Sequence, residues 1–168
     1  MSVDGIIHKY ALDGTYIDSF GSAYIADRPF VVSQISSQGY LACSAPSNIV
    51  GLVRSFMPYI YGYSHNGTLL WVFRLEDFVS SGVLQGKTDD GRASLRYPAM
   101  QVGHSLHMGL DVDGHGHFLL HYITVDKTSA LSRYDFTSTG HVFRIDPFTA
   151  KGTCWATLNG FTAAWGTM

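Results

Sequence analysis

A segment with the pattern of a β-hairpin occurs three times in the chain, and this repeat limits the fold more than any other feature. Its clearest copy spans residues 60–73, where two runs of aromatic and β-branched residues flank the dipeptide Asn66-Gly67. Such residues favour strands, and Asn-Gly favours the type I′ turn that joins two strands through two residues. None of the copies shows the apolar spacing of three and four residues that a helix needs. The repeat therefore predicts an all-β chain of antiparallel strands.

The other two copies align with this one strand by strand. The first strands correspond as residues 7–10, 60–63 and 142–145, and the second strands as residues 15–20, 68–73 and 153–158. Asp13-Gly14 takes the place of Asn66-Gly67 in the first copy. The third copy contains Pro147, which has no backbone N–H to donate to a tight ladder. We therefore expect a longer loop in the third hairpin than in the other two.

The stretches between the hairpins contain further strand patterns. One inner pair is predicted over residues 30–35 and 40–43, and residues 47–57 are interpreted as a connection. A second inner pair is predicted over residues 108–113 and 117–123, again around a glycine-containing turn. The order is thus hairpin, inner pair, hairpin, inner pair, hairpin.

A polar, glycine-rich excursion interrupts this order at about residues 75–105. Its composition predicts a surface loop, with one short helical turn over residues 75–79. Loops of this length are often functional. Arg92, Arg96 and Tyr97 lie in the excursion and are not required by the repeat, so we expect any ligand site to include them.

Length and composition limit the chain to one domain and exclude several partners. The 168 residues fit a single domain over residues 1–168, and 14% charged residues, 14% aromatic residues and 18 glycines are typical of short strands joined by turns. A formal net charge of -2 without a Lys/Arg run argues against nucleic-acid binding. No apolar run reaches the about 20 residues of a membrane helix, and residues 1–5 lack the features of a signal peptide. We expect a soluble chain that does not bind membranes, in a compartment that the sequence does not specify.

Segments such as residues 110–120 and residues 7–17 resemble the strand-turn-strand cores of NHL-like six-bladed β-propellers. The spacing of the repeat, a unit of about 40–55 residues with four short strands, is also typical of propeller blades. The resemblance implies about three blades, or half a propeller. Blades bury their faces against neighbours, so either a longer protein or a second copy of the chain would complete the ring. A single closed sandwich or barrel made from the same strands is the alternative.

Five histidines gather in one stretch and form the candidate metal site. They are His104, His107, His115, His117 and His121. With Asp111 or Asp113 they could bind zinc or another transition metal. The local spacing defines no ligand triad, and a structural or solvent-exposed role explains the same residues.

No catalytic template is present in the sequence, so no catalytic residue is assigned. The chain lacks a Gly-x-Ser-x-Gly elbow, a Walker loop and a dinucleotide fingerprint. We therefore expect a non-enzymatic binding or scaffold module without a cofactor, which presents loops to a protein or a small ligand. The alternative is a metal-dependent propeller hydrolase or lyase that uses the histidines between 104 and 121. Cys43 and Cys154 lie in apolar strand patterns and are predicted to be buried free thiols.

Overall fold

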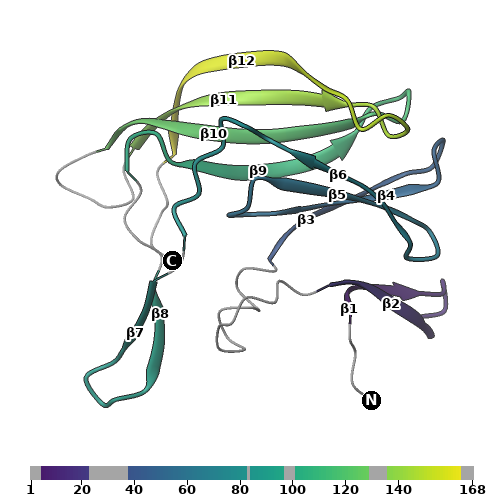
Figure 1. Cartoon of the computed structure of the whole chain (residues 1–168), viewed down its shortest axis with the longest axis horizontal. Coiled ribbons are helices and arrows are strands. Elements are labelled where there is room, and N and C mark those ends of the chain that lie inside the picture. Colours follow the sequence, from purple (N-terminus) through teal and green to yellow (C-terminus); the bar gives the residue numbers. More distant parts are fainter. Residues whose placement is uncertain (1–4, 23–37, 83, 97–100, 129–135, 164–168) are drawn as a thin grey trace.

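The computed structural model of the chain describes residues 5–22, 38–82, 84–96, 101–128 and 136–163, which form twelve β-strands and no helix (Figure 1). The strands are β1 Gly5–Tyr10, β2 Tyr16–Ser22, β3 Gly39–Ser44, β4 Ile49–Arg54, β5 Tyr59–Ser64, β6 Leu69–Arg74, β7 Leu84–Lys87, β8 Ala93–Arg96, β9 Ser105–Val112, β10 Phe118–Thr128, β11 Phe136–Ile145 and β12 Gly152–Ala163. All sheet pairings between them are antiparallel. The prediction of an all-β, antiparallel chain is confirmed.

The strands form two four-stranded sheets and two separate hairpins. The middle sheet has the order β3-β4-β5-β6, and the C-terminal sheet has the order β9-β10-β11-β12. The N-terminal hairpin is β1-β2, and β7-β8 is the second hairpin. Each four-stranded sheet is thus a meander of consecutive strands, and each described sheet is open rather than closed into a barrel.

The interpretation of residues 47–57 as a connection was wrong, because β4 lies there. Strand β3, which contains residues 40–43, pairs with β4 in the register Gly39↔Arg54 to Ser44↔Ile49. Residues 30–35, the predicted partner, lie outside the described residues. Strand β4 is an almost continuously apolar run because both faces of the middle sheet are covered, so the alternation that marks a half-buried strand does not appear in it.

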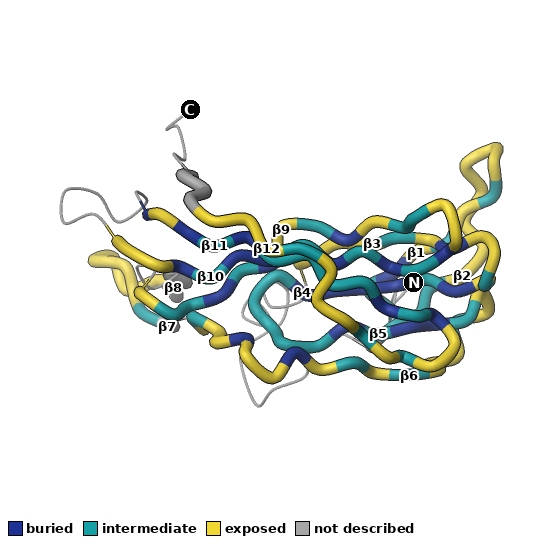
Figure 2. The backbone as a smooth tube through the Cα atoms, turned by 90° about the horizontal axis from the view of Figure 1, so that it is seen from above, coloured by how far each residue is buried: buried dark blue, intermediate teal, exposed yellow. Residues whose placement is uncertain are grey.

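The N-terminal hairpin, the middle sheet and the C-terminal sheet are stacked in this order (Figure 1). The main core lies between the two sheets, and its most buried members are Val53, Ile60, Phe118, Leu120 and Ile145. A smaller cluster, with Ile7, Leu52 and Tyr63 as its buried members, joins the hairpin to the middle sheet. Figure 2 shows the buried residues along the strands and the exposed residues at the turns. Hydrophobic burial between stacked faces therefore holds the layers together.

Four of the hairpin turns share one conformation that differs from the predicted type I′. Each has a three-residue loop that ends in a glycine with φ between 82° and 86°: Gly14, Gly67, Gly91 and Gly116. In the second copy of the repeat, the amide of Gly67 donates to the carbonyl of Ser64 and the Ser64 amide donates to the carbonyl of Thr68. Asn66 does not have the positive φ that a type I′ turn demands. The loop is a type I turn followed by a left-handed glycine, which is the usual three-residue hairpin.

The first two copies of the repeat have the same register, and the third differs. Ile7 pairs with Phe20 as Ile60 pairs with Phe73, and Tyr10 pairs with Tyr16 as Tyr63 pairs with Leu69. In the third copy, Leu158 pairs with Gly140 and Cys154 pairs with Phe143. The second strands correspond as predicted, but the first strand of the third copy is shifted by two residues, because its ladder continues to Ile145↔Gly152 before the longer loop. A shift of two leaves every side chain on its expected face.

The excursion is only partly a surface loop. Leu75 and Phe78 are buried members of the main core, and no helix forms over residues 75–79, so the expected helical turn was wrong. The rest contains the β7-β8 hairpin, which projects away from the two sheets (Figure 1). No helix in the described part of the chain is long and apolar enough to cross a membrane.

Candidate functional site

A hollow of about 430 Å³ lies beside the C-terminal sheet and is the candidate binding site. Strands β10, β11 and β12 supply most of its lining, and Asp77 reaches it from the segment that follows β6. The lining residues are Asp77, Tyr122, Thr124, Asp126, Thr139, His141, Phe143 and Cys154. Strand pairing explains why these side chains meet: Tyr122 lies opposite His141, and Thr124 lies opposite Thr139. Side chains at alternate positions of neighbouring strands share one face of the sheet.

The middle of the hollow is aromatic. The rings of Tyr122 and His141 are stacked, with centroids 4.6 Å apart, and the Phe143 ring centroid lies 5.9 Å from that of Tyr122. Burial raises the pKa of the Tyr122 hydroxyl to about 12, and the Asp77 carboxylate adds to this effect. Burial also lowers the pKa of His141, although Asp126 and Asp77 act against the change. Near neutral pH both rings are therefore uncharged, and the half-buried His141 ring, stacked on the buried Tyr122, is the more accessible of the two.

Two carboxylates, Asp77 and Asp126, complete the lining. Thr139 Oγ1 donates to Asp126 Oδ2 at 2.9 Å, which holds this carboxylate in place. None of the described lining residues is Lys or Arg. The hollow thus combines negative charge with aromatic faces, and both attract cations.

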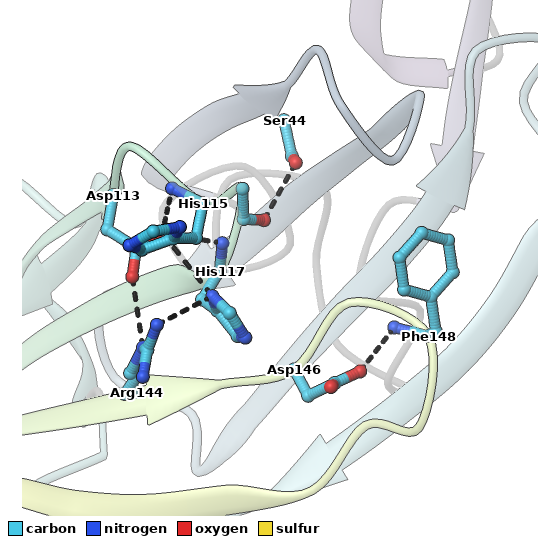
Figure 3. A network of polar contacts seen from close by, with 8 residues as sticks. Ser44, Asp113, His115, His117, Arg144, Asp146 and Phe148 are labelled. Carbon is cyan, nitrogen blue, oxygen red and sulfur yellow. Dashed lines mark hydrogen bonds and ion pairs between the residues drawn. The ribbon is translucent and has the colours of Figure 1, made fainter.

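A second polar cluster lies where the turn after β9 meets β11 (Figure 3). Asp113 Oδ1 accepts hydrogen bonds from the amides of His115 and His117, both at 2.9 Å, and Arg144 Nε donates to Asp113 Oδ2 at 2.9 Å. Burial would raise the pKa of Asp113, but these donors together lower it to about 2. Ser44 Oγ donates to the carbonyl of Gly116 at 2.7 Å. These hydrogen bonds close the turn and attach it to the middle sheet, so the cluster has a structural role.

His117 belongs to the same cluster. Its Nδ1 lies 2.9 Å from the Arg144 guanidinium and 3.4 Å from Asp113 Oδ1. A guanidinium can only donate, so Nδ1 accepts and the proton of the neutral ring is on Nε2. The lone pair of Nδ1 is therefore already in use.

The other four histidines of the predicted metal site lie in different surroundings. His107 is buried, stacks on Phe78 with ring centroids 4.4 Å apart, and has Nε2 at 2.8 Å from the Met57 carbonyl. Burial lowers its pKa to about 4, against the effect of the Met57 hydrogen bond. His104 Nδ1 accepts from the amide of Gln101 at 3.2 Å, His115 is exposed in its turn, and His121 Nε2 lies 3.6 Å from Asp111 Oδ2.

The structure does not bring these histidines together as ligands. Within the ranges that the structure describes, no group of three or more His, Cys, Asp or Glu side chains could hold a metal ion. All five histidines lie in those ranges, as do Asp111 and Asp113.

The predicted ligand-binding residues of the excursion do not line the hollow. The Arg92 side chain is exposed and pairs with Asp90, with Nε 3.1 Å from Oδ2. Arg96 ends β8, where it pairs with Leu84, and Tyr97 lies outside the described residues.

Sequence reasoning missed the polar residues of the hollow. Asp77, Asp126 and His141 belong to three separate segments, and no local motif connects them. Only the pairing of β10 with β11, which the sequence analysis did not predict, shows that His141 faces Tyr122. Cys154 was expected to be buried; both cysteines are free thiols as predicted, but both are exposed.

No protein-family model, no curated protein and no solved structure matches this chain.

Proposed function

We propose that the chain is a non-enzymatic binding module of the β-propeller type, about half of a ring, that binds a small cationic ligand in the hollow beside the C-terminal sheet. Two four-stranded meanders and a hairpin stacked in one direction support the propeller-type arrangement. The observation that carries the binding proposal is the hollow itself, in which aromatic rings and two carboxylates face the same space.

The size and chemistry of the hollow support a small ligand. Ligand pockets have volumes of about 300–1,000 Å³, and the volume here, about 430 Å³, lies in that range. Asp77 and Asp126 favour a positive charge, and the stacked Tyr122 and His141 rings offer a flat face to an aromatic or guanidinium group. Its volume and its two carboxylates support ligand binding most directly.

The metal-dependent hydrolase or lyase receives less support. Such an enzyme needs converging ligands, and the histidines between 104 and 121 occupy separate places on β9, β10 and their turn. Metal analysis of the purified protein, together with chelator titration, compares the two proposals directly. Stoichiometric metal that is lost together with thermal stability, and that His117→Ala and His121→Ala also remove, would replace the binding module with the metal enzyme.

Two planar probes of opposite charge test the binding proposal. We expect benzamidine to bind in the hollow and benzoate to bind much more weakly, as measured by nuclear magnetic resonance shifts of the β10 and β11 amides. Asp126→Asn removes one exposed carboxylate and should weaken benzamidine binding by about threefold. Asp111→Asn, which removes an exposed carboxylate outside the hollow, is the matched control and should leave binding unchanged. Equal binding of both probes, or shifts confined to other strands, would refute the proposal.

A further inference from the structure

The stacked layers contact one another through the same positions of the repeat. Phe20 of the N-terminal hairpin lies over Gly67 of the middle sheet, where an added Cβ would come within 2.7 Å of the phenylalanine Cβ. Phe73, which corresponds to Phe20, lies over Gly152, which corresponds to Gly67, and an added Cβ would come within 2.6 Å of Phe73 Cζ. The same contact thus occurs at both interfaces: a side chain from the second strand of one hairpin covers the turn-side glycine of the next hairpin.

The receiving face is also repeated. In the middle sheet it contains Tyr61 and Tyr63, and the Phe20 ring centroid lies 5.7 Å from that of Tyr63. In the C-terminal sheet the register places His141 and Phe143 at the same positions. The next strand supplies Val50 and Leu52 in the middle sheet, and Leu120 and Tyr122 in the C-terminal sheet. Each receiving face therefore presents two rings from one strand and two large side chains from its neighbour.

The two ends of the stack carry the unused halves of this contact. On the N-terminal hairpin, His8 and Tyr10 occupy the positions of Tyr61 and Tyr63, and both are exposed, Tyr10 by 58%. Among the described residues, nothing lies within 4 Å of the position that a Cβ on Gly14 would take. On the C-terminal sheet, Leu158 occupies the position of Phe73 and is 51% exposed, whereas Ile123 on the same face is buried within the chain. Among the described residues, the hairpin therefore presents the two-ring half of a receiving face at one end of the stack, and an exposed covering side chain lies at the other end.

We infer that a second copy of this chain docks head to tail, so that Leu158 of one copy covers Gly14 and Tyr10 of the other. The inference rests on the proposed propeller-type repeat, and it identifies the binding partner as a second copy of the chain. Two copies related by a two-fold axis make this contact twice, because the C-terminal sheet of each copy meets the N-terminal hairpin of the other. The occupant is a second copy rather than another protein, because both halves of the contact are present on one chain and the chain already makes this contact twice within itself.

Sedimentation equilibrium and light scattering at micromolar concentration test the inference. The unaltered chain should be a dimer, and Leu158→Asp or Tyr10→Lys should weaken dimerisation by about tenfold or more, since each places a charge in both apolar contacts. Val102→Asp is the matched control: Val102 is 64% exposed and lies in the segment before β9, outside both strands of the proposed contact. An equimolar mixture of Leu158→Asp and Tyr10→Lys should regain association, because the mixed dimer has one unaltered contact and one Asp–Lys contact.

Three outcomes would overturn the inference. They are a monomer of the unaltered chain at these concentrations, a growing series of oligomers, and a dimer that Leu158→Asp and Tyr10→Lys do not affect. Both altered residues are exposed in the single copy, so folding should be retained, and a thermal melt checks this. Phe73→Ala tests the underlying repeat separately. If this change destabilises the chain while the unaltered chain is monomeric, the repeat stands and the docking fails; if it has no effect, the repeat itself fails.

Discussion

The two interfaces of the stack use the same positions of the repeat but bury very different amounts of apolar surface. Among the described residues, ten buried residues form one cluster between the middle and C-terminal sheets, whereas three buried residues join the N-terminal hairpin to the middle sheet. The difference follows from strand number, because two strands offer a narrower face than four. A repeated contact therefore does not give repeated stability, and we expect the N-terminal hairpin to open at a lower free energy than the sheets.

Matched isoleucine truncations at the two interfaces should have the largest effect. Ile145 is fully buried between the two sheets, and Ile7 is buried between the hairpin and the middle sheet. We expect Ile145→Ala to lower the free energy of unfolding by about 4 kcal/mol, because it leaves a cavity between two broad sheets. Ile7→Ala should cost about 2 kcal/mol, since the hairpin can relax around the change. Urea denaturation measures both values, and equal losses would show that the interfaces do not differ in strength.

The pH dependence of stability should report on the larger interface through His107. Burial lowers its pKa from 6.5 to about 4, so the unfolded chain binds a proton there between these values while the folded chain does not. Stability should therefore fall as the pH decreases from about 6.5 to about 4, by on the order of 3 kcal/mol. Below about pH 4 the His107 contribution to the loss of stability ends, because the histidine is then protonated in both the folded and the unfolded chain.

A variant that keeps the Met57 hydrogen bond but does not titrate separates this effect from others. His107→Gln should flatten the pH dependence between these two values, as measured by denaturation at several pH values. His115→Gln, at an exposed turn position, should leave the slope unchanged. An unchanged slope in His107→Gln would show that other groups, such as His141, dominate the acid sensitivity.

Alanine at two turn glycines separates packing from backbone strain. Gly67 and Gly14 have φ values of 86° and 83°, so alanine has a similar left-handed strain of about 1 kcal/mol at both positions. Only at Gly67 would the new methyl group meet Phe20. Gly67→Ala should therefore cost about 2 kcal/mol more than Gly14→Ala, as measured by thermal denaturation. Equal costs would indicate that Phe20 moves away freely and that the smaller interface is looser than described.

Much of the strand architecture could be predicted from the sequence, because turn glycines and runs of aromatic and β-branched residues are local signals. The hairpins around Gly14 and Gly67 form where predicted, with loops of three residues rather than two. Strand β4 was missed because burial on both faces removes the alternation of a surface strand. The half-propeller arrangement and its completion by a second copy stay predictions.

The candidate site could not be predicted, because it depends on long-range register. The register of β10 with β11, which no local signal in the sequence sets, places His141 opposite Tyr122. The burial of His107 also has a distant cause, since Phe78 covers it from the segment that was interpreted as a surface excursion. Residue types suggested metal ligands in this region, but neighbours far apart in sequence determined their surroundings.

The two ends of the excursion meet in space. The Ser105 amide donates to the carbonyl of Val79 at 2.8 Å, and Ser80 and Ser105 form an isolated parallel bridge. The chain thus leaves the stack and returns to it at one point, so the length of the intervening segment does not affect how the core packs. Replacement of this segment by a peptide of another length should therefore leave the stacked layers intact.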